Sequence, residues 1–355
     1  MKTADINMLI ENTKNNSLGK VETGLNDLRL RFKAETILST LGSLKNLKVL
    51  VIGDCILDEY VFCDLMERAK KEPVLVFKHV NTELYPGGSL AIANHIANFA
   101  GEVTIITSMG GDKKADIFLD RRIIHKIFTD KNNVTLIKKR YVYRYRNTKV
   151  FEVYSHGGYE IDNELEKEIS TYIDNNIDNF DVVIVADFGH GFITNGIKES
   201  ILKSKKFLAI NAQTNSGNLG YNYITRYKNF DFATLTEEEL RLPLQDSKSS
   251  IDELVKQMGN LLNCKKICVT LGKKGIVYYQ DRIYQLPVFS TRVVDTVGAG
   301  DAILAIISLL AYKKVDPEII PFIGNCVGAL AVRTMGNKEP INPIDLNRFI
   351  VNLLS

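Results

Sequence analysis

Residues 295–301 place two glycines and an aspartate between a β-prone segment and a long apolar stretch. The segment 288–294 is rich in β-branched and apolar residues, and residues 302–310 are apolar except for Ser308. Glycine permits backbone conformations closed to residues with a Cβ atom and lets a ligand approach the main chain. The first amides of a helix lack intrahelical partners and form an anion site. The pattern therefore predicts a strand-to-helix turn that can bind an anion.

Asp301 follows this turn and stands at the mouth of the anion site. A carboxylate repels a phosphate, so phosphate binding alone does not explain its position. A carboxylate can instead accept the proton of a hydroxyl that attacks the phosphoryl group. We expect phosphoryl transfer from a nucleotide to an alcohol, with Asp301 as the base and the amides of Gly298, Ala299 and Gly300 stabilising the transferred group. The alternative is a helix cap, since aspartate is a preferred capping residue.

The full sequence DTVGAGD of residues 295–301 resembles the C-terminal signature of the ribokinase-like (PfkB-type) carbohydrate kinases. The resemblance extends over about residues 46–355 and implies a kinase domain there, preceded by a flexible arm and a lead-in helix in residues 1–45. Alternating strand and helix patterns predict a three-layer, doubly wound α/β domain with a mostly parallel sheet. The family adds a small β-sheet lid, ATP and Mg²⁺ as cofactors, and in some members a monovalent cation such as K⁺.

The composition is that of an ordinary soluble globular protein, with 45% hydrophobic and 25% charged residues. A formal net charge of +3 is too small to indicate a nucleic-acid or membrane partner. No apolar run reaches membrane-spanning length, and the N-terminus lacks a signal-peptide pattern. The five cysteines include no C-x-x-C pair, so neither a disulfide framework nor a zinc site is expected. We therefore expect a cytoplasmic enzyme that acts on a small molecule.

The N-terminal third contains the first candidates for substrate binding. Residues 1 to about 24 are polar and predict a flexible arm, whereas residues 25–44 have helical apolar spacing. Residues 49–53 are apolar and lead into Asp54, as expected of a buried parallel strand that ends at a ligand crevice. In the family the second acidic residue of this Gly-Asp-x-x-x-Asp pattern binds substrate hydroxyls, which implicates Asp58. Asp54 is either a ligand or a turn residue.

Two β-rich stretches, within about residues 60–86 and 136–155, resemble the lid of these kinases. A lid excludes water, which would compete as the acceptor. Between them Gly87 and Gly88 open a predicted helix, and the family signature directs their amides towards the sugar. Many relatives have asparagine where this chain has Ala91, so Asn94 or His95 is a candidate replacement. A purely structural role for these two side chains is equally open.

Arginine and tyrosine alternate in residues 140–146. Such a segment can stack nucleic-acid bases, but the chain has no other basic stripe. We therefore interpret it as a strand whose Arg140, Arg144 or Arg146 reaches a phosphorylated substrate.

A second buried-strand pattern, residues 180–187, ends in the sequence DFGHG of residues 187–191. It resembles the D-Y-G-K-G stretch of bacterial heptose kinases, with His190 in place of lysine. Asp187 is a candidate to approach the substrate or to organise the waters of a metal ion. Stabilisation of the turn is the alternative role.

The nucleotide side is expected in the C-terminal half. Thr270, Gly272 and Gly275 resemble the family's nucleotide-phosphate loop, and Asn325 corresponds to an asparagine that borders the adenine pocket. Residues 236–239 correspond to the family's Asn-x-x-Glu, in which the glutamate helps to set the metal, so Glu239 or the adjacent Glu238 is the candidate. Consecutive glutamates are also typical of a solvated first helical turn.

Within the family the similarity is greatest to the D-glycero-D-manno-heptose 7-phosphate kinases, through residues 53–60, 72–74 and 187–191. It implies transfer of the ATP γ-phosphoryl group to a sugar or sugar-phosphate hydroxyl, a functional link to a nucleotidyltransferase, and a homodimer as one form of assembly. Kinases of nucleosides, fructose phosphate or vitamins are alternatives. A catalytically silent sugar- or nucleotide-binding subunit is another, motivated by Ala91, His190, Asn211 and Thr236, and the presence of Asp301 argues against it.

Overall fold

The computed structural model describes residues 19–112, 118–156, 158, 161–218, 220–289 and 293–355. Within these residues the main sheet has nine strands in the order β13-β12-β11-β10-β9-β8-β1-β4-β5. Neighbouring strands from β11 to β5 are parallel, and β12 and β13 are antiparallel additions at one edge. The strands are β1 (Lys48–Gly53), β4 (Glu102–Gly110), β5 (Ile123–Asp130), β8 (Val182–Asp187), β9 (Phe207–Ala212), β10 (Phe232–Thr236), β11 (Lys266–Thr270), β12 (Ile276–Tyr279) and β13 (Ile283–Leu286).

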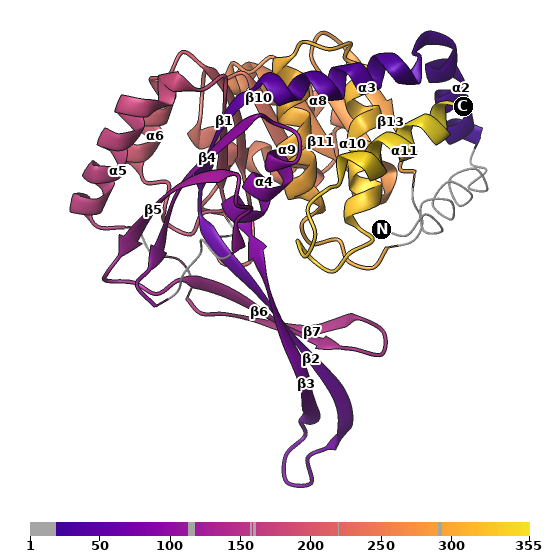
Figure 1. Cartoon of the computed structure of the whole chain (residues 1–355). Helices are drawn as coiled ribbons and strands as arrows, with labels where there is room; N and C mark the ends of the chain where they lie inside the picture. The colour runs from indigo at the N-terminus through magenta and orange to yellow at the C-terminus, as the bar shows by residue number, and fades with distance from the viewer. Residues whose placement is uncertain (1–18, 113–117, 157, 159–160, 219, 290–292) are drawn as a thin grey trace.

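Helices cover both faces of this sheet, which makes three layers (Figure 1). Successive side chains of a strand point to opposite faces, and in β1 Val49 and Val51 join one core cluster while Leu50 and Ile52 join the other. The first cluster includes residues of α3 (Ala34–Ser43), α4 (Gly88–Ala97), α9 (Ala299–Tyr312), α10 (Ile319–Ala331) and α11 (Pro343–Leu354). The second includes residues of α5 (Asn163–Asn176), α6 (Asn195–Leu202), α7 (Glu237–Leu244) and α8 (Ile251–Leu262).

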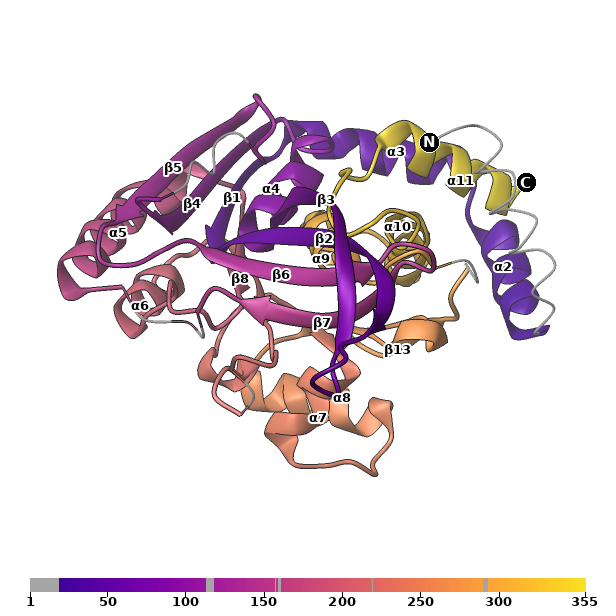
Figure 2. The same cartoon turned by 90° about the horizontal axis from the view of Figure 1, so that it is seen from below.

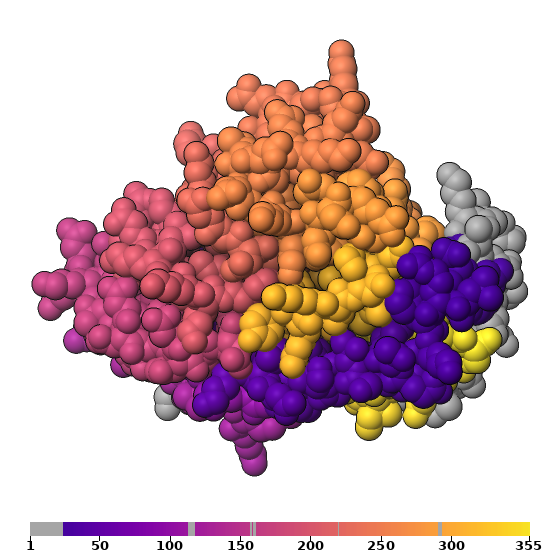
Figure 3. Space-filling model, turned by 90° about the horizontal axis from the view of Figure 1, so that it is seen from above, coloured from indigo at the N-terminus to yellow at the C-terminus, as the bar shows by residue number. Residues whose placement is uncertain are grey.

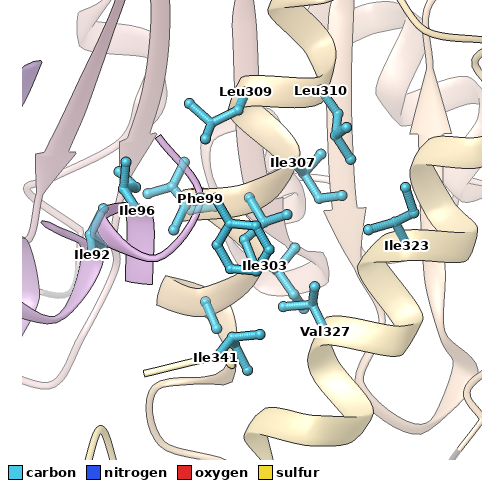
Figure 4. Packing of buried hydrophobic residues seen from close by; sticks show 14 of the residues in the cluster. Ile92, Ile96, Phe99, Ile303, Ile307, Leu309, Leu310, Ile323, Val327 and Ile341 are labelled. Atoms are coloured by element: carbon cyan, nitrogen blue, oxygen red, sulfur yellow. The ribbon is translucent and has the colours of Figure 1, made fainter. Parts of the chain in front are cut away.

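The helix that carries Asp301 is packed into the first cluster. Side chains of α9, among them Ile303 and Ile307, lie between those of α4 and those of α10, such as Ile323 (Figure 4). Residues 302–311 of α9 are all buried. Because apolar burial on this scale fixes the helix rigidly, the N-terminus of α9 is held at a defined place.

A second, four-stranded sheet projects from one end of the main sheet (Figures 1 and 2). Its order is β3-β2-β6-β7, and its strands are β2 (Cys55–Arg68), β3 (Leu75–Gly87), β6 (Leu136–Tyr143) and β7 (Thr148–Tyr154). We call it the lid. Strand β2 follows β1 after a single residue, Asp54, so the lid begins at residue 55 rather than near residue 60. The root of the lid therefore lies at the carboxyl end of β1.

Three local expectations were wrong. Residues 288, 289, 293 and 294 are outside any strand, and the amides of Val294 and Asp295 instead donate to Val332 O at the end of α10 (2.7 and 3.2 Å).

The predicted helix of residues 25–44 is two helices, α2 (Gly19–Arg31) and α3, and α2 extends into the predicted arm. Burial of Leu25 and Leu28 in the first core cluster explains why α2 is ordered. The N-terminal helices lie beside the C-terminal part of the chain (Figure 3). The rest of the predicted arm, residues 1–18, lies outside the described residues.

All five cysteines are buried free thiols. In the described part of the chain, no helix combines the length and apolar character needed to cross a bilayer.

Candidate active site

The turn before α9 is shaped by Gly298. This residue has a φ of 84° and serves as the N-cap of α9, a left-handed conformation that favours glycine. A Cβ atom here would also lie 2.1 Å from Oδ1 of Asn337, so the side chain of Asn337 takes the space that a larger residue would need. A Cβ atom on Gly300 would meet nothing within 4 Å, which leaves room beside the helix start. The predicted glycine turn and helix are therefore present, whereas the described residues before the turn do not form the predicted strand.

One of the three predicted anion-site amides already has an acceptor. Ala299 N donates to Thr296 O over a long 3.4 Å. Anion binding by the amides of Gly298, Ala299 and Gly300 stays a prediction. The Ala299 amide would have to give up its weak hydrogen bond to Thr296 in order to bind the ligand.

Asp301 is two residues into α9, in the first turn. Burial, followed by the negative charge of Asp58, raises the pKa of Asp301 to about 7. Asn337 donates to Oδ2 of Asp301 over 3.3 Å, and the positive charges of Lys138 and Arg140 act in the opposite direction on the pKa. A carboxyl group with a pKa near neutrality can accept a proton in one step and release it in the next, which suits a general base.

The lid brings three charged side chains to this carboxylate. Parallel pairing of β2 with β6 sets Asp58 opposite Lys138, and Arg140 lies two residues further along the same face of β6. All three are buried, at 4%, 5% and 6% exposure. Arg140 forms an ion pair with Asp58 through Nη1 and with Glu152 through Nε (3.0 Å). Two of the predicted residues, Asp58 and Arg140, thus lie together beside Asp301.

The other two candidate arginines lie elsewhere. Arg144 pairs with Asp64 (2.7 Å), with more than half of its side chain exposed, and Arg146 is exposed in the turn between β6 and β7.

Gly87 and Gly88 lie against the end of β1. Gly88 has a φ of 55° and begins α4, and Ser89 N donates to Asp54 O (3.1 Å). A Cβ atom on Gly87 would lie 2.7 Å from Oδ2 of Asp58, so the glycine lets the backbone approach this carboxylate. The predicted pair therefore adjoins Asp58.

Asn94 and His95 hold backbone segments. Asn94 Nδ2 donates to Phe118 O (2.7 Å) and its Oδ1 accepts from Asp120 N (2.9 Å). His95 Nδ1 accepts from Ile341 N (3.0 Å), and burial lowers the pKa of His95 to about 4. A substrate contact of Asn94 would have to replace one of its present bonds, and its binding role stays a prediction.

Asp187 is the centre of a buried network. Its carboxylate accepts from Tyr227 Oη (2.5 Å), Arg226 Nη1 (3.1 Å), Asn222 Nδ2 (3.1 Å) and Gly189 N (3.0 Å). Asp54 next to it accepts from Phe188 N (2.8 Å), and burial together with the charge of Asp187 raises the pKa of Asp54 to about 7. These contacts fit turn stabilisation, the alternative named for both residues, and the substrate or metal role of Asp187 stays a prediction.

The predicted nucleotide residues are at the carboxyl end of β11 and around α10. Gly272 has a φ of 56° with open space at its Cβ position, whereas a Cβ atom on Gly275 would lie 2.1 Å from Leu286 O. Thr270 ends β11, and Asn325 Nδ2 donates to Leu286 O (3.0 Å). Gly272 is therefore the accessible member of this group, and Gly275 and Asn325 shape the wall behind it.

Glu239 is engaged within its own helix. It forms a capping box with Thr236 and also accepts from Thr214 N (3.2 Å). Burial raises its pKa to about 7. Among the described residues no group of three or more His, Cys, Asp or Glu side chains is placed to hold a metal ion. A Mg²⁺ ion in such a site would take nucleotide phosphates and water as most of its ligands, which is its usual mode.

Lys138 and Asn337 were missed by the sequence reasoning. Lys138 lies in the strand predicted to carry Arg140, and the alternation of side chains along a strand places residues 138 and 140 on one face. Asn337 follows Gly336 in the turn after α10, and no sequence pattern links it to Asp301.

The model of the pfkB family carbohydrate kinases matches residues 46–344. The chain belongs to this family. The bifunctional protein HldE of Campylobacter jejuni (strain RM1221) is 22% identical over 293 residues, which cover 82% of this chain and 62% of that protein. The bifunctional protein HldE of Pelobacter propionicus is 25% identical over 329 residues, 88% of this chain and 66% of that protein. This pfkB chain thus spans about two thirds or less of these relatives.

Solved structures give the same fold. Phosphofructokinase-2 from Escherichia coli, in complex with potassium, superimposes with a TM-score of 0.70 at 14% identity, covering 86% of this chain and 99% of that one. Ribokinase from Thermotoga maritima gives a TM-score of 0.65 at 17% identity, with 85% and 99% covered. The ribokinase-like fold class expected from the sequence is confirmed. Membership of the pfkB carbohydrate kinase family makes the chain a phosphotransferase with an alcohol acceptor.

Proposed function

We propose that this pfkB family kinase transfers the γ-phosphoryl group of ATP to a hydroxyl of a phosphorylated sugar, with a heptose 7-phosphate as the first candidate. The observation that supports it best is the set of buried charged side chains, Asp58, Lys138 and Arg140, beside the half-buried Asp301 where the lid meets the N-terminus of α9. It combines a base with a binding surface for an anionic, hydroxyl-rich molecule.

Asp301 accepts the proton of the attacking hydroxyl. Its raised pKa keeps the carboxyl group close to the point at which it can both accept and release a proton at neutral pH. Asn337 holds one carboxylate oxygen, so the other can face the hydroxyl. Asp58, fixed by Arg140, accepts hydrogen bonds from further hydroxyls and so orients the sugar.

Two cations next to this base favour an acceptor that carries its own negative charge. Arg140 is matched by Asp58 and Glu152. Lys138 has no carboxylate partner in the described part of the chain, and its ammonium group lies 5.0 Å from the centre of the Tyr154 ring. Burial lowers its pKa. Because a buried ammonium group without an ion-pair partner is costly, a phosphate group of the acceptor would add to the compensation that the charges of Asp58 and Asp301 already give.

A small cavity of about 40 Å³ lies beside His190. Asp54, Thr135 and His190 contribute to its lining, and His190 is 5% exposed. Neither ring nitrogen of His190 has a hydrogen-bond partner among the described residues. A polar group of a bound ligand would complete the hydrogen bonding of His190.

ATP supplies the phosphoryl group when bound, and Mg²⁺ neutralises charge on its phosphates. We assign the phosphates to Gly272 and the start of α9, the adenine side to the wall near Asn325, and Glu239 to the waters of the metal ion. A requirement for K⁺ stays a prediction.

We infer a functional link with a nucleotidyltransferase, because the HldE relatives are named bifunctional and are longer than this chain. A homodimer stays a prediction.

The test is ADP release with Mg-ATP across paired acceptors: a heptose with and without its 7-phosphate, fructose 6-phosphate and fructose, and a nucleoside. We expect kcat/KM to be about 100-fold higher for one phosphorylated sugar than for its unphosphorylated partner, because Lys138 has no phosphate to pair with in the latter. Equal turnover of both partners, or turnover of the nucleoside alone, would contradict the sugar-phosphate assignment. Bound ATP with no turnover on any acceptor would favour a binding subunit.

A further inference from the structure

Asp295, six residues before Asp301, is a buried carboxylate held by the lid. It is 5% exposed. Its Oδ1 accepts from Lys149 Nζ (2.5 Å) and Val297 N (3.1 Å), and its Oδ2 accepts from Tyr60 Oη (2.9 Å) and Gly336 N (3.1 Å). Tyr60 is in β2 and Lys149 is in β7, so two of the four donors belong to the lid. The other two are backbone amides of the turns beside the catalytic base.

Both of those turns reach Asp301. Val297 precedes Gly298, the N-cap of α9. Gly336 precedes Asn337, whose amide group bonds Asp301 and fills the space beside Gly298. The lid touches the second turn once more, since Lys338 Nζ lies 2.8 Å from Glu83 Oε2 of β3. Asp295 therefore joins the lid to both turns that position the base.

Lys149 supplies the charge in this junction. Burial alone would raise the pKa of Asp295, but the hydrogen bond and charge of Lys149 lower it, with help from the Val297 amide. A buried carboxylate that loses its cation is left uncompensated, which is strongly unfavourable. The hydrogen bonds around Asp295 thus depend on Lys149, a side chain of the lid.

We propose that Lys149 is a positioning residue that couples lid closure to the geometry of the catalytic turn. With the lid in place, the Lys149 ammonium group and the Tyr60 hydroxyl fix Asp295, and Asp295 fixes the turns at Val297 and Gly336. With the lid displaced, Asp295 loses its counter-charge and the turn before Asp301 loses its support. The proposal rests on the proposed kinase function, and it makes transfer competent only when the lid excludes water.

The test replaces Lys149 by alanine and by methionine, the latter keeping most of the apolar stem. We expect kcat to fall about 10- to 100-fold in both variants with KM for ATP within a factor of three, because misplacement of the turn affects transfer more than nucleotide binding. Ammonium or methylammonium chloride should restore activity in Lys149→Ala, because the truncated side chain leaves space for a small cation beside Asp295. Tetramethylammonium chloride at equal ionic strength should not.

The matched control is Lys78→Ala, an exposed lysine of the same lid, which should leave kcat unchanged. Wild-type kcat in Lys149→Ala, or a fall in kcat that no small cation restores, would overturn the proposal.

Hydrogen exchange of the amides in residues 294–302 gives a readout that does not depend on activity. We expect faster exchange in Lys149→Met than in wild type, confined to this segment and to residues 334–338. If wild type transfers no phosphoryl group but this exchange difference is present, the kinase function fails and the coupling of the lid stands. An unchanged exchange pattern would contradict the coupling itself.

Discussion

The acceptor half and the nucleotide half of the candidate site are built by different means. The acceptor half uses the buried charged side chains of Asp58, Lys138 and Arg140, whose charges act on the pKa of the half-buried Asp301. The nucleotide half uses backbone shape, with left-handed glycines at 272 and 275 and a buried Asn325 that bonds the main chain. The difference suits the task, since ATP presents the same phosphates in every kinase whereas the acceptor must be recognised and deprotonated. Substitutions in the two halves should therefore have effects of different size and kind.

The largest effect is expected from Asp301→Asn. Loss of the base should lower kcat about 10²- to 10⁴-fold. Because the backbone of the turn is retained, ATP affinity measured by calorimetry should stay within a factor of three. Asp252→Asn, on the exposed first turn of α8, is the control. A rate within tenfold of wild type would assign proton removal to another group.

Arg140→Met should rank second. It removes the ion-pair partner of Asp58 and a cation beside the acceptor, so the Asp58 carboxylate stays buried without its counter-charge. We expect kcat/KM for the sugar phosphate to fall about 100-fold. Arg144→Met, on the exposed part of the same lid, is the matched control and should have little effect. An equal fall in the two variants would show that general lid stability is being measured.

The pH dependence follows from the raised pKa of Asp301. The base acts when deprotonated, so kcat/KM should rise with pH through about 7 and level off above it. From pH 6 to pH 8 the increase should be about tenfold for a single group of this pKa. The small residual rate of Asp301→Asn should lack this inflection. A flat wild-type profile would show that protonation of Asp301 does not control kcat/KM.

The glycines of the nucleotide half should give the smallest kinetic effects. Gly275→Ala places a Cβ atom 2.1 Å from Leu286 O at a φ of 94°, so it should lower the free energy of unfolding. A left-handed conformation alone costs a residue with a Cβ atom about 1–2 kcal/mol. Gly272→Ala, at a φ of 56° with open space, should unfold less easily than Gly275→Ala and raise KM for ATP about threefold. Denaturant unfolding of both variants tests the predicted order of stability, and ATP titration tests the predicted change in KM.

Much of the fold and of both halves of the site could be predicted from the sequence, because hydrophobic periodicity and the placement of glycines report on local structure. Buried strands such as β1 and the glycine turn at residue 298 have strong local patterns, and the catalytic heptapeptide resembles a family signature. The predicted strand before the turn was wrong, because β-branched residues such as Val294 also suit an irregular segment whose amides bond Val332 at the end of α10. Asn337 and Lys149 were inaccessible, since both act through contacts made across more than 35 residues of chain. Asp187 shows the converse: a site-like motif holds a buried hydrogen-bond network, and its role at the substrate or the metal stays a prediction.

The most direct measurement of the central claim is phosphorus NMR of heptose 7-phosphate mixed with Mg-ATP and the enzyme. We expect a second phosphate ester on the sugar, formed in equal amount with ADP, and no such signal over the same time with Asp301→Asn. ADP accompanied only by inorganic phosphate would show that water is the acceptor. It would contradict the assignment of the buried group around Asp301 to a sugar phosphate.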